Sequence, residues 1–439
     1  MILNIFRKLV PSFLIDWYHF LLPALGAFLY RFPSKKMIII GVTGTSGKST
    51  VVNFTTEILI KAGYKAASLS SIKFKIGQKV WPNTLKMTMP GRLELQKFLR
   101  KALDANCQYV VLEVTSEGIK QHRHRFIDFD VAVFTNLTPE HIEAHGSFEK
   151  YREAKGKLFQ GLRSGAKILN DKKIKKVSII NLDDENTEYF LNFPADKKIG
   201  FTTVPPKKVY RGRASVIEAE NVQVLHSGIK FSLKDEEFNL KLLGEFNIYN
   251  ALAAICVGLS QEIDFGTCKS ALEKIEGIPG RMEIVIKSPF KVFVDYAHTP
   301  VALEKVYRTL TTNNYQLEAG RLICVLGACG GGRDKWKRPI LGKLAAKYCD
   351  EIIVTNEDPY DENPMEIINQ VASGAGGRAK KILDRKEAIK EALKIAEAGD
   401  IVVITGKGCE PWMCVAGNRK IPWDDRKVVK EEFKNLYEI

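Results

Sequence analysis

A glycine-rich segment that contains a lysine and adjacent hydroxyls, Gly41–Thr50, holds the residue types that bind nucleotide phosphates. It follows the apolar run Met37–Ile40 and precedes the helix-like stretch Val51–Ile60, so the predicted order is strand, turn, helix. Backbone N–H groups in such a turn can surround a phosphate chain, and the helix start adds a favourable dipole. Lys48 can reach the outer phosphates, and the hydroxyl of Ser49 or Thr50 can hold Mg²⁺. The segment therefore predicts that the protein uses a nucleoside triphosphate.

Polar side chains follow several apolar runs that alternate with helix-like stretches in the first part of the chain. The runs are 109–114, 130–137 and 177–182. Alternation of this kind predicts an α/β fold on a parallel sheet, and ligands of such sheets bind at the carboxyl ends of the strands. Glu113, Asn136 and Asp183 lie at or near these ends. Glu113 is therefore a candidate Mg²⁺ ligand beside the phosphate-binding turn.

The strand–helix rhythm restarts beyond a hinge-like sequence at Gly277–Arg281. The later runs are 292–295, 322–327, 351–355 and 401–405. They predict a second, Rossmann-like domain. We expect three parts: an apolar helical segment at 1–36, a central P-loop ATP-binding domain at 37–278 and a C-terminal Rossmann-like domain at 279–439.

The composition of the 439-residue chain is that of a globular protein, with 45% apolar and 27% charged residues. A formal net charge of +15 favours anionic partners: nucleotides, acidic substrates, nucleic acid or an anionic membrane. The lysines are scattered in pairs, so for the charge alone we favour a solvated lysine-rich surface. The eight cysteines have no CxxC spacing, which predicts buried thiols in a reducing compartment and no zinc site.

The first part of the chain is apolar, and Trp17–Tyr30 carries no formal charge. This stretch is shorter than the roughly 20 residues that span a bilayer, and Pro23 interrupts it. A secretion signal is disfavoured because a nucleotide site that needs cytosolic ATP follows at once. We expect either an interfacial helix on an anionic membrane or a helix packed on the protein body.

Ten motifs stand in a fixed order along the chain: GVTGTSGKST, LEVTSEG with QHR, FTNLTPEH, YREAK, GEFNIYNALAA, GIPGRME, VDYAHTP, GGRDKWKRP, DRKEAI and TGKGCE. In this order they resemble the Mur ligases over residues 37–439, and most of all those that add the third residue of the peptidoglycan stem peptide. The resemblance implies a cytoplasmic ATP-dependent ligase that activates an acceptor carboxylate as an acyl phosphate and joins it to an amino acid. It implies a muramyl-peptide-like acceptor in cell-wall synthesis.

The resemblance also implies roles for individual residues. The ATP-binding residues are Gly44, Thr45, Gly47, Lys48, Ser49, Thr50, Asn247, Asn250, Arg281 and Asp295. Two Mg²⁺ sites would use Ser49, Glu113, His141 and Lys155, the lysine after CO₂ has converted it to a carbamate. The catalytic residues are Lys48, Lys155, His141 and Arg333, and the acceptor contacts are Thr88, Thr115, Gln121 and Arg123. The incoming amino acid would meet Arg333, Glu357, Asp358, Tyr360, Gly406 and Glu410.

Several positions depart from the family pattern. Ser46 replaces an asparagine, Glu117 and Cys409 replace histidines, and Glu357–Tyr360 reads Glu-Asp-Pro-Tyr where the family has Asp-Asn-Pro-Arg. The arginine that selects diaminopimelate is missing and the site is acidic, so we predict a basic amino acid: lysine, ornithine or arginine. The alternative is that the two acidic residues only cap a helix. The motifs include no counterpart of the family's uridine-binding domain, which leaves the carrier of the acceptor open.

Three alternatives remain at this stage. A related ligase could use another acceptor, as in cyanophycin or folylpolyglutamate synthesis. A P-loop nucleic-acid ATPase would suit the positive charge, but no helicase-like motif is present and the Lys155 region would have no role, so we expect no nucleic-acid partner. A catalytically silent membrane scaffold would not need Lys48, Glu113, His141 and Lys155. We expect small-molecule partners, an amino acid and a peptide-like acceptor, with an anionic membrane as a further partner through residues 1–36.

Overall fold

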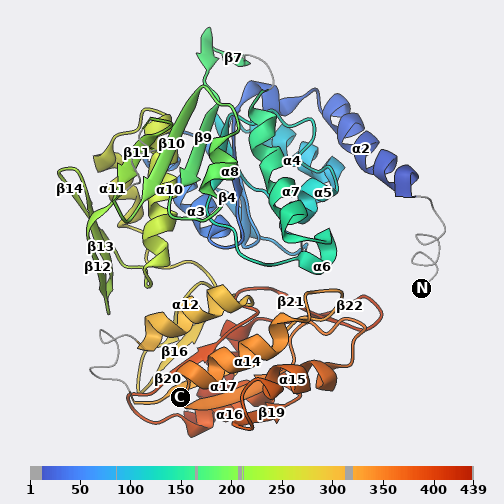
Figure 1. The fold of residues 1–439 in the computed structure, drawn as a ribbon, viewed down its shortest axis with the longest axis vertical. Helices are drawn as coiled ribbons and strands as arrows, with labels where there is room; N and C mark the ends of the chain where they lie inside the picture. Colours follow the sequence, from blue (N-terminus) through green and yellow to red (C-terminus); the bar gives the residue numbers. More distant parts are fainter. Residues whose placement is uncertain are drawn as a thin grey trace.

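The computed structural model describes residues 12–85, 87–163, 167–205, 210, 212–311 and 320–437. The first eleven residues of the predicted N-terminal segment, with Arg7 and Lys8, lie outside the described residues. The chain forms two bodies that follow one another along the longest axis, one blue to yellow-green and one orange to red (Figure 1). Each body has its own sheet covered by helices, as the predicted α/β class requires.

A nine-stranded sheet forms the first body, in the order β11-β10-β9-β6-β1-β5-β2-β3-β4. All of its strand pairs are parallel except those of β3 with β2 and β4. The strands are β1 Ile38–Thr43, β2 Ala66–Leu69, β3 Lys73–Ile76, β4 Lys79–Pro82, β5 Tyr109–Glu113, β6 Val131–Phe134, β9 Val177–Asn181, β10 Lys197–Thr202 and β11 Ser215–Glu218.

Side chains of β1 alternate between two hydrophobic cores because successive residues of a strand point to opposite faces. Ile40 and Val42 pack with one set of helices, and Ile39 packs with the other. The first core contains α3 Lys48–Lys61, α10 Phe246–Ser260, α11 Phe265–Leu272 and the antiparallel sheet of β12 Glu220–Leu225, β13 Gly228–Leu233 and β14 Glu236–Leu240. The second contains α4 Arg92–Asp104, α5 Ser116–Lys120, α7 Phe148–Gln160 and α8 Thr187–Leu191.

A six-stranded sheet forms the second body, in the order β15-β16-β20-β17-β18-β19, with only β15 antiparallel. The strands are β15 Glu283–Ile286, β16 Lys291–Val294, β17 Leu322–Leu326, β18 Glu351–Thr355, β19 Ala379–Ile382 and β20 Ile401–Ile404. Helices α12 Pro300–Thr311, α14 Lys337–Tyr348 and α15 Pro364–Ser373 cover one face, and α16 Arg385–Ile395 and α17 Asp425–Tyr437 cover the other. The hairpin of β21 Trp412–Val415 and β22 Arg419–Pro422 follows β20. This is the Rossmann-like arrangement that the later apolar runs predict.

The core of the first body ends at Ile278, and Met282 already belongs to the core of the second. Leu243 and Phe246 reach across from the first body to the second core. We therefore propose a domain boundary between residues 278 and 279.

Two sequence expectations differ from the structure. The predicted strand at 130–137 is shorter, because Thr135 and Asn136 bond the phosphate-binding turn and the Leu137 N–H donates to Asp184. The predicted interruption at Pro23 is wrong: the helix α2, Ser12–Leu29, continues through it and packs along α4. Among the described residues, no helix has the length and apolarity needed to cross a membrane.

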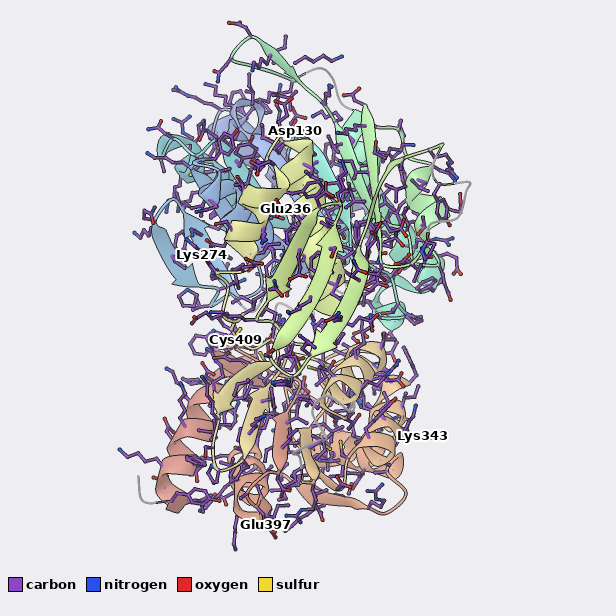
Figure 2. All side chains as sticks on the ribbon, turned by 90° about the vertical axis from the view of Figure 1, so that its left-hand side faces the viewer. Asp130, Glu236, Lys274, Lys343, Glu397 and Cys409 are labelled. Carbon is purple, nitrogen blue, oxygen red and sulfur yellow. The ribbon has the colours of Figure 1, made fainter. Side chains whose placement is uncertain are left out.

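A cluster of buried charges joins the chain between α2 and β1 to the end of the sheet. Lys167 Nζ donates to Asp130 Oδ2 (2.5 Å) and to the carbonyl oxygens of Ser34 (2.9 Å) and Met37 (3.0 Å). Lys176 Nζ donates to the other Asp130 oxygen (3.0 Å). Asp130 lies at the end of the first body that is remote from the second (Figure 2). Because each charge is paired, we interpret the cluster as structural.

Candidate active site

A cavity of about 870 Å³ lies between the two bodies. Its wall is formed at the carboxyl ends of parallel strands from both sheets, where ligands of α/β proteins bind. Every candidate site residue of the sequence analysis lines this cavity except Asn247. The structure therefore brings together residues that are as much as 366 positions apart in the chain, from Gly44 to Glu410.

The phosphate-binding turn connects β1 to α3, as predicted. Gly44 and Gly47 have positive φ angles of 151° and 83°, and a side chain at either would collide with Thr135 or Asn250. Lys48 Nζ donates to the carbonyl oxygen of Thr45 (2.8 Å), which folds the amine back over the turn. Burial is the main cause that lowers the Lys48 pKa. A half-buried cation here suits a phosphate chain.

A group of oxygen atoms lies directly after Lys48. Ser49 Oγ donates to Glu113 Oε2 (2.8 Å) and lies 2.8 Å from Ser71 Oγ. The Ser71 N–H donates to the same Glu113 oxygen (2.9 Å). Two hydroxyls and a carboxylate are ligands that Mg²⁺ accepts. The donor set therefore fits the first of the two Mg²⁺ sites that the resemblance implies. Ser71 was not predicted, because nothing in its local sequence links it to Glu113.

Lys155 lies on α7 and is 2% exposed. Its Nζ donates to the Gly44 carbonyl oxygen (2.7 Å) and lies 4.6 Å from the centre of the Tyr151 ring. Burial, and then the positive charge of Lys48, hold the Lys155 pKa well below its usual value. Lys155 is thus a buried lysine and not a solvent-exposed one on the helix surface.

His141 and Arg333 come from different bodies and meet in the cavity. Arg333 Nη1 lies 3.2 Å from His141 Nδ1. Burial, followed by the charge of Arg333, lowers the His141 pKa, so the ring is a neutral acceptor at pH 7. The described residues contain no cluster of three or more His, Cys, Asp or Glu side chains placed to hold a metal. A second Mg²⁺ at His141 and Lys155 fits this donor set only if the amine of Lys155 becomes an anionic ligand and Arg333 turns away.

Three further contacts join the two bodies beside this pair. Lys337 Nζ donates to Glu140 Oε1 (2.8 Å), and both side chains are 3% exposed. Asp334 accepts from the N–H groups of Ile142 (3.3 Å) and Glu143 (2.9 Å), at the start of α6, Ile142–His145. These contacts hold the loop that carries Arg333 against the loop that carries His141. They were missed from the sequence.

The nucleoside side of the cavity is formed by α10 and the start of the second body. Asn250 lines the cavity, whereas Asn247 lies behind it and accepts a hydrogen bond from Asn250 Nδ2 (2.9 Å). A direct adenine contact of Asn247 is therefore not supported by this geometry, because its amide also donates to the Leu243 carbonyl oxygen (2.7 Å). Asp295 accepts from two backbone N–H groups at 2.7 Å. The Arg281 guanidinium lies 4.5 Å from the centre of the Tyr296 ring.

The predicted acceptor residues lie at another end of the cavity. Gln121 Oε1 accepts from Arg123 Nη2 (2.7 Å), and Arg123 also donates to the Met89 carbonyl oxygen. The Thr115 hydroxyl accepts from the Gly118 N–H (3.1 Å) and caps α5. Thr88 lines the same region. Burial lowers the Arg123 pKa, yet the group stays cationic at neutral pH and suits an acceptor carboxylate.

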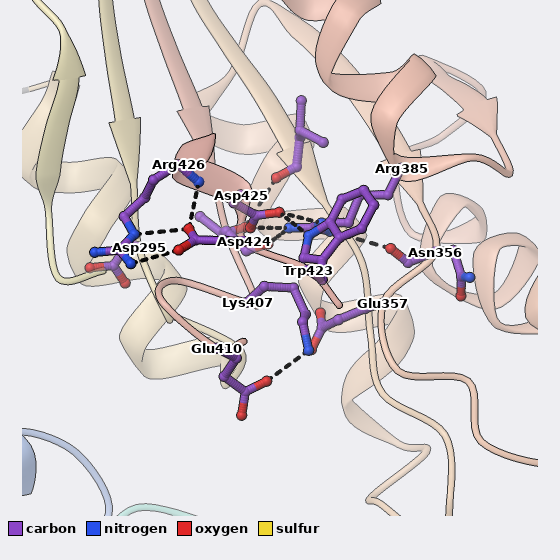
Figure 3. A network of polar contacts seen from close by, with 12 residues as sticks. Asp295, Asn356, Glu357, Arg385, Lys407, Glu410, Trp423, Asp424, Asp425 and Arg426 are labelled. Carbon is purple, nitrogen blue, oxygen red and sulfur yellow. Dashed lines mark hydrogen bonds and ion pairs between the residues drawn. The ribbon is translucent and has the colours of Figure 1, made fainter. Parts of the chain in front are cut away.

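The predicted amino-acid residues form a buried acidic group in the second body. Lys407 Nζ donates to Asp358 Oδ1 at 2.8 Å. It also donates to Glu410 Oε2 at 2.8 Å (Figure 3). Glu357 Oε1 accepts from the Cys329 thiol (2.9 Å), and its Oε2 has no hydrogen-bond partner among the described residues. Burial raises the Glu357 pKa. Lys407 bonds two of the three carboxylates, so this end of the cavity has an excess of negative charge.

The remaining predicted residues of this end are placed by close packing. Gly406 lies against the Glu357 carboxylate, and Tyr360 packs on Gly331. Asp358 accepts from the Cys414 N–H (2.8 Å) and from Lys407, so it does not cap a helix. The sequence analysis did not single out Lys407, although it stands inside the TGKGCE motif. Cys409 lies where the two bodies meet (Figure 2).

Two family models match the chain. The family model described as "Mur ligase middle domain" matches residues 42–258. The family model described as "Mur ligase, glutamate ligase domain" matches residues 280–408.

Relatives match almost the whole chain. A protein of Roseiflexus sp. (strain RS-1) named UDP-N-acetylmuramyl-tripeptide synthetase is 36% identical over 98% of this chain and 85% of its own length. A protein of Syntrophomonas wolfei subsp. wolfei named UDP-N-acetylmuramoyl-L-alanyl-D-glutamate–2,6-diaminopimelate ligase is 38% identical over 93% of this chain and 81% of its own length.

Solved structures give the same result. A structure of a UDP-N-acetylmuramoyl-L-alanyl-D-glutamate–2,6-diaminopimelate ligase shares 30% identity and a TM-score of 0.59, covering 92% of this chain and 79% of that one. Folylpolyglutamate synthase of Mycobacterium tuberculosis, at 17% identity and a TM-score of 0.66 over 88% of this chain and 92% of that one, shares the fold alone. Because both family models match and the relatives align over most of their length, the chain belongs to the Mur ligase family.

Proposed function

We propose that the protein joins a basic amino acid to the carboxylate of a muramyl-peptide-like acceptor in cell-wall synthesis. As a Mur ligase it is an ATP-dependent acid–amino-acid ligase that forms a carbon–nitrogen bond. The observation that supports the proposal is the single cavity in which a phosphate-binding turn, a cationic acceptor end and an acidic amine end face one another. An amide ligase gives each of these ends a role, which neither a nucleic-acid ATPase nor a silent scaffold would do.

The chemistry requires two steps. A carboxylate is a poor electrophile, so its oxygen first attacks the γ-phosphorus of ATP and ADP leaves, which gives an acyl phosphate. The amine then attacks the acyl carbon, loses a proton and expels inorganic phosphate. Lys48, which lines the cavity, would neutralise charge on the transferred phosphoryl group. Arg123 would hold the acceptor at one end and Arg333 the carboxylate of the incoming amino acid at the other.

Enzymes of this family use Mg²⁺, which shields the phosphate charges when bound. Ser49 and Glu113 would hold one ion, and His141 and Lys155 would hold a second. Lys155 would contribute as a carbamate, formed when its neutral amine adds CO₂. The lowered pKa of Lys155 supports this, because only the neutral amine reacts. The buried position beside the Gly44 carbonyl oxygen would protect the product from water.

The amine end supports a basic amino acid. The unpaired Glu357 Oε2 is an acceptor for a distal ammonium group, and no arginine at position 360 is present to bind a distal carboxylate. Asp358 and Glu410 add negative charge, of which Lys407 neutralises part. A diaminopimelate carboxylate placed here would meet like charges, which is unfavourable in a buried site.

We also propose a cytoplasmic location at the inner face of an anionic membrane, attached through α2. The helix exposes Trp17, Leu21 and Phe28, while Gly26 faces α4. Burial of each large apolar side chain contributes about 1.5–3 kcal/mol. Each basic residue near an anionic surface adds about 1 kcal/mol. A few such residues are enough for reversible attachment.

The test is a matrix of candidate acceptors and amino acids in which phosphate release is measured and products are identified by mass spectrometry. N-acetylmuramoyl-L-alanyl-D-glutamate with lysine is the first pair, because relatives carry that dipeptide in their names. We expect ATP-dependent amide formation. A folate or cyanophycin acceptor that alone is ligated would contradict the proposed acceptor, and DNA-stimulated hydrolysis without ligation would contradict the proposed activity.

A further inference from the structure

An apolar stripe runs along the outer face of α2. Its members recur at helical spacing, and each is at least 49% exposed: Trp17, Tyr18, Leu21, Leu25, Phe28 and Leu29. The opposite face is buried, with Pro23, Gly26 and Ala27 against the protein body. Packing on α4 therefore leaves the stripe uncovered by the described residues. Exposed aromatic and aliphatic side chains on one helix face are typical of an interfacial helix.

The same helix is bonded to the acceptor end of the cavity. His19 of α2 contacts the Arg92 guanidinium at the start of α4. Arg92 Nε in turn donates to the carbonyl oxygen of Gln121 (3.0 Å), a residue of the cavity wall. Phe20 packs edge-on against Phe126, with ring centres 5.4 Å apart. The orientation of α2 is thus fixed relative to the place where the acceptor carboxylate would be held.

Apolar side chains continue from the stripe towards the cavity. Leu93 touches α2 at Gly26, and both Leu93 and Phe126 are 36% exposed. Met87, which is 42% exposed, lies in the cavity wall within 3.4 Å of Arg123. Exposed apolar groups therefore lie both beside α2 and at the acceptor end.

Basic residues accompany the apolar stripe. Arg31, Lys35 and Lys36 follow the helix and are exposed, and Arg125 lies over the Phe20 ring. The chain has no acidic residue between Trp17 and Lys36. A bilayer with anionic headgroups offers both an apolar layer for the stripe and negative charge for these cations.

We propose that the outer face of α2 rests on an anionic bilayer and that the acceptor enters the cavity from this surface, as a carboxylate on a lipid-anchored molecule. The inference rests on the proposed function and names the carrier of its acceptor. The contacts through Arg92 place the acceptor end beside the membrane-facing helix, so a headgroup peptide can reach the catalytic groups while its lipid stays in the bilayer.

The first test measures membrane attachment of the full chain. It uses vesicles of phosphatidylglycerol with phosphatidylcholine, and vesicles of phosphatidylcholine alone. We expect the protein to sediment with the anionic vesicles only. The double variant Leu21→Ser/Phe28→Ser should bind at least about tenfold more weakly, since each change removes a large apolar side chain from the interface. Ile168→Ser is the matched control, because Ile168 is 65% exposed on a hairpin outside the stripe. Failure to bind anionic vesicles overturns the proposal. A wild-type dimer that the double variant loses also overturns it, because the stripe would then pair two copies of the chain.

The second test presents one acceptor, N-acetylmuramoyl-L-alanyl-D-glutamate, in three forms: free, linked to UDP, and anchored to a diacyl lipid in the anionic vesicles. We expect kcat/KM to be at least about tenfold higher for the anchored form, and Leu21→Ser/Phe28→Ser to remove this advantage while the rate with the free form stays unchanged. Equal rates, or a preference for the UDP form, overturn the inference and leave the proposed function intact. Absence of ligation with all three forms contradicts this acceptor and overturns both.

Discussion

Replacing Lys155 by methionine should separate catalysis from stability. Methionine keeps most of the length of the buried side chain and removes the amine. The loss of the hydrogen bond from the Lys155 amine to the Gly44 carbonyl oxygen costs about 0.5–1.5 kcal/mol. Removal of a buried amine returns about 1.4 kcal/mol for each unit by which its pKa is lowered. Because the relief from desolvation opposes the loss of the hydrogen bond, we expect the free energy of unfolding at pH 7 to fall by no more than about 1.5 kcal/mol.

Activity should respond quite differently. Loss of a preorganised group that stabilises transferring charge typically lowers the rate by about 10²–10³-fold. We therefore expect Lys155→Met to lose amide formation by at least about 100-fold. The matched control is Lys157→Met on the exposed face of the same helix, which should retain activity. Intact-mass measurement in bicarbonate should show one added CO₂ on the wild type that is absent from Lys155→Met.

The pH dependence has a definite sign. The folded-state pKa of Lys155 is lowered, so its contribution to stability is fully present above the unfolded pKa of about 10.5 and is lost as pH falls through the folded pKa. Between neutral pH and pH 10 the wild type should therefore gain stability relative to Lys155→Met. Urea unfolding at several pH values measures this difference. Full activity of Lys155→Met, together with a wild-type mass that carries no CO₂, would refute the reasoning.

Three other predictions follow from the site and the fold. Lys48→Ala should retain the circular dichroism spectrum and lose ligation by at least about 100-fold, since charge stabilisation is removed; near-normal turnover would exclude the phosphate-binding role. Lysine should have a higher kcat/KM than diaminopimelate, and Glu357→Gln should reduce the kcat/KM for lysine at least tenfold. A preference for diaminopimelate would contradict the proposed basic substrate. Asp130→Asn should lower the free energy of unfolding, measured with urea, by about 3 kcal/mol, because it removes the negative charge that pairs with the buried ammonium groups of Lys167 and Lys176. A loss below about 1 kcal/mol would show that these ion pairs do not stabilise the fold.

Local patterns in the sequence were sufficient for the elements around the nucleotide turn. The helix-like stretch at 51–60 lies within α3, Lys48–Lys61, and the strand predicted at 109–114 is found at Tyr109–Glu113. Spacing did not show which of Asn247 and Asn250 faces the cavity, since residues three apart lie on the same side of a helix. The tertiary position of α10 decides it: Asn250 approaches Gly47, and Asn247 bonds its own helix start.

Contacts between the two bodies could not be read from the sequence. Glu140 and Lys337 are separated by 197 positions, and their pairing depends on how the hinge near residue 278 orients two separately folded sheets. The N-terminal segment shows a second limit. An apolar stretch predicts burial without identifying the neighbour, and α2 in fact has one face on α4 and another that is exposed.

The cations of the cavity explain why nucleotide binding and closure of the two bodies should depend on one another. Lys48 belongs to the first body, and Arg281 belongs to the boundary with the second. Burial is the largest cause that lowers the Lys48 pKa, and the positive charge of Arg281 adds to it. Bringing these groups together therefore costs free energy that an anionic triphosphate can offset. Two contacts hold the bodies together against this repulsion: Lys337 with Glu140, and Asp334 with the start of α6. A triphosphate should thus favour the closed arrangement in which Arg333 and the acidic amine end face the phosphate-binding turn.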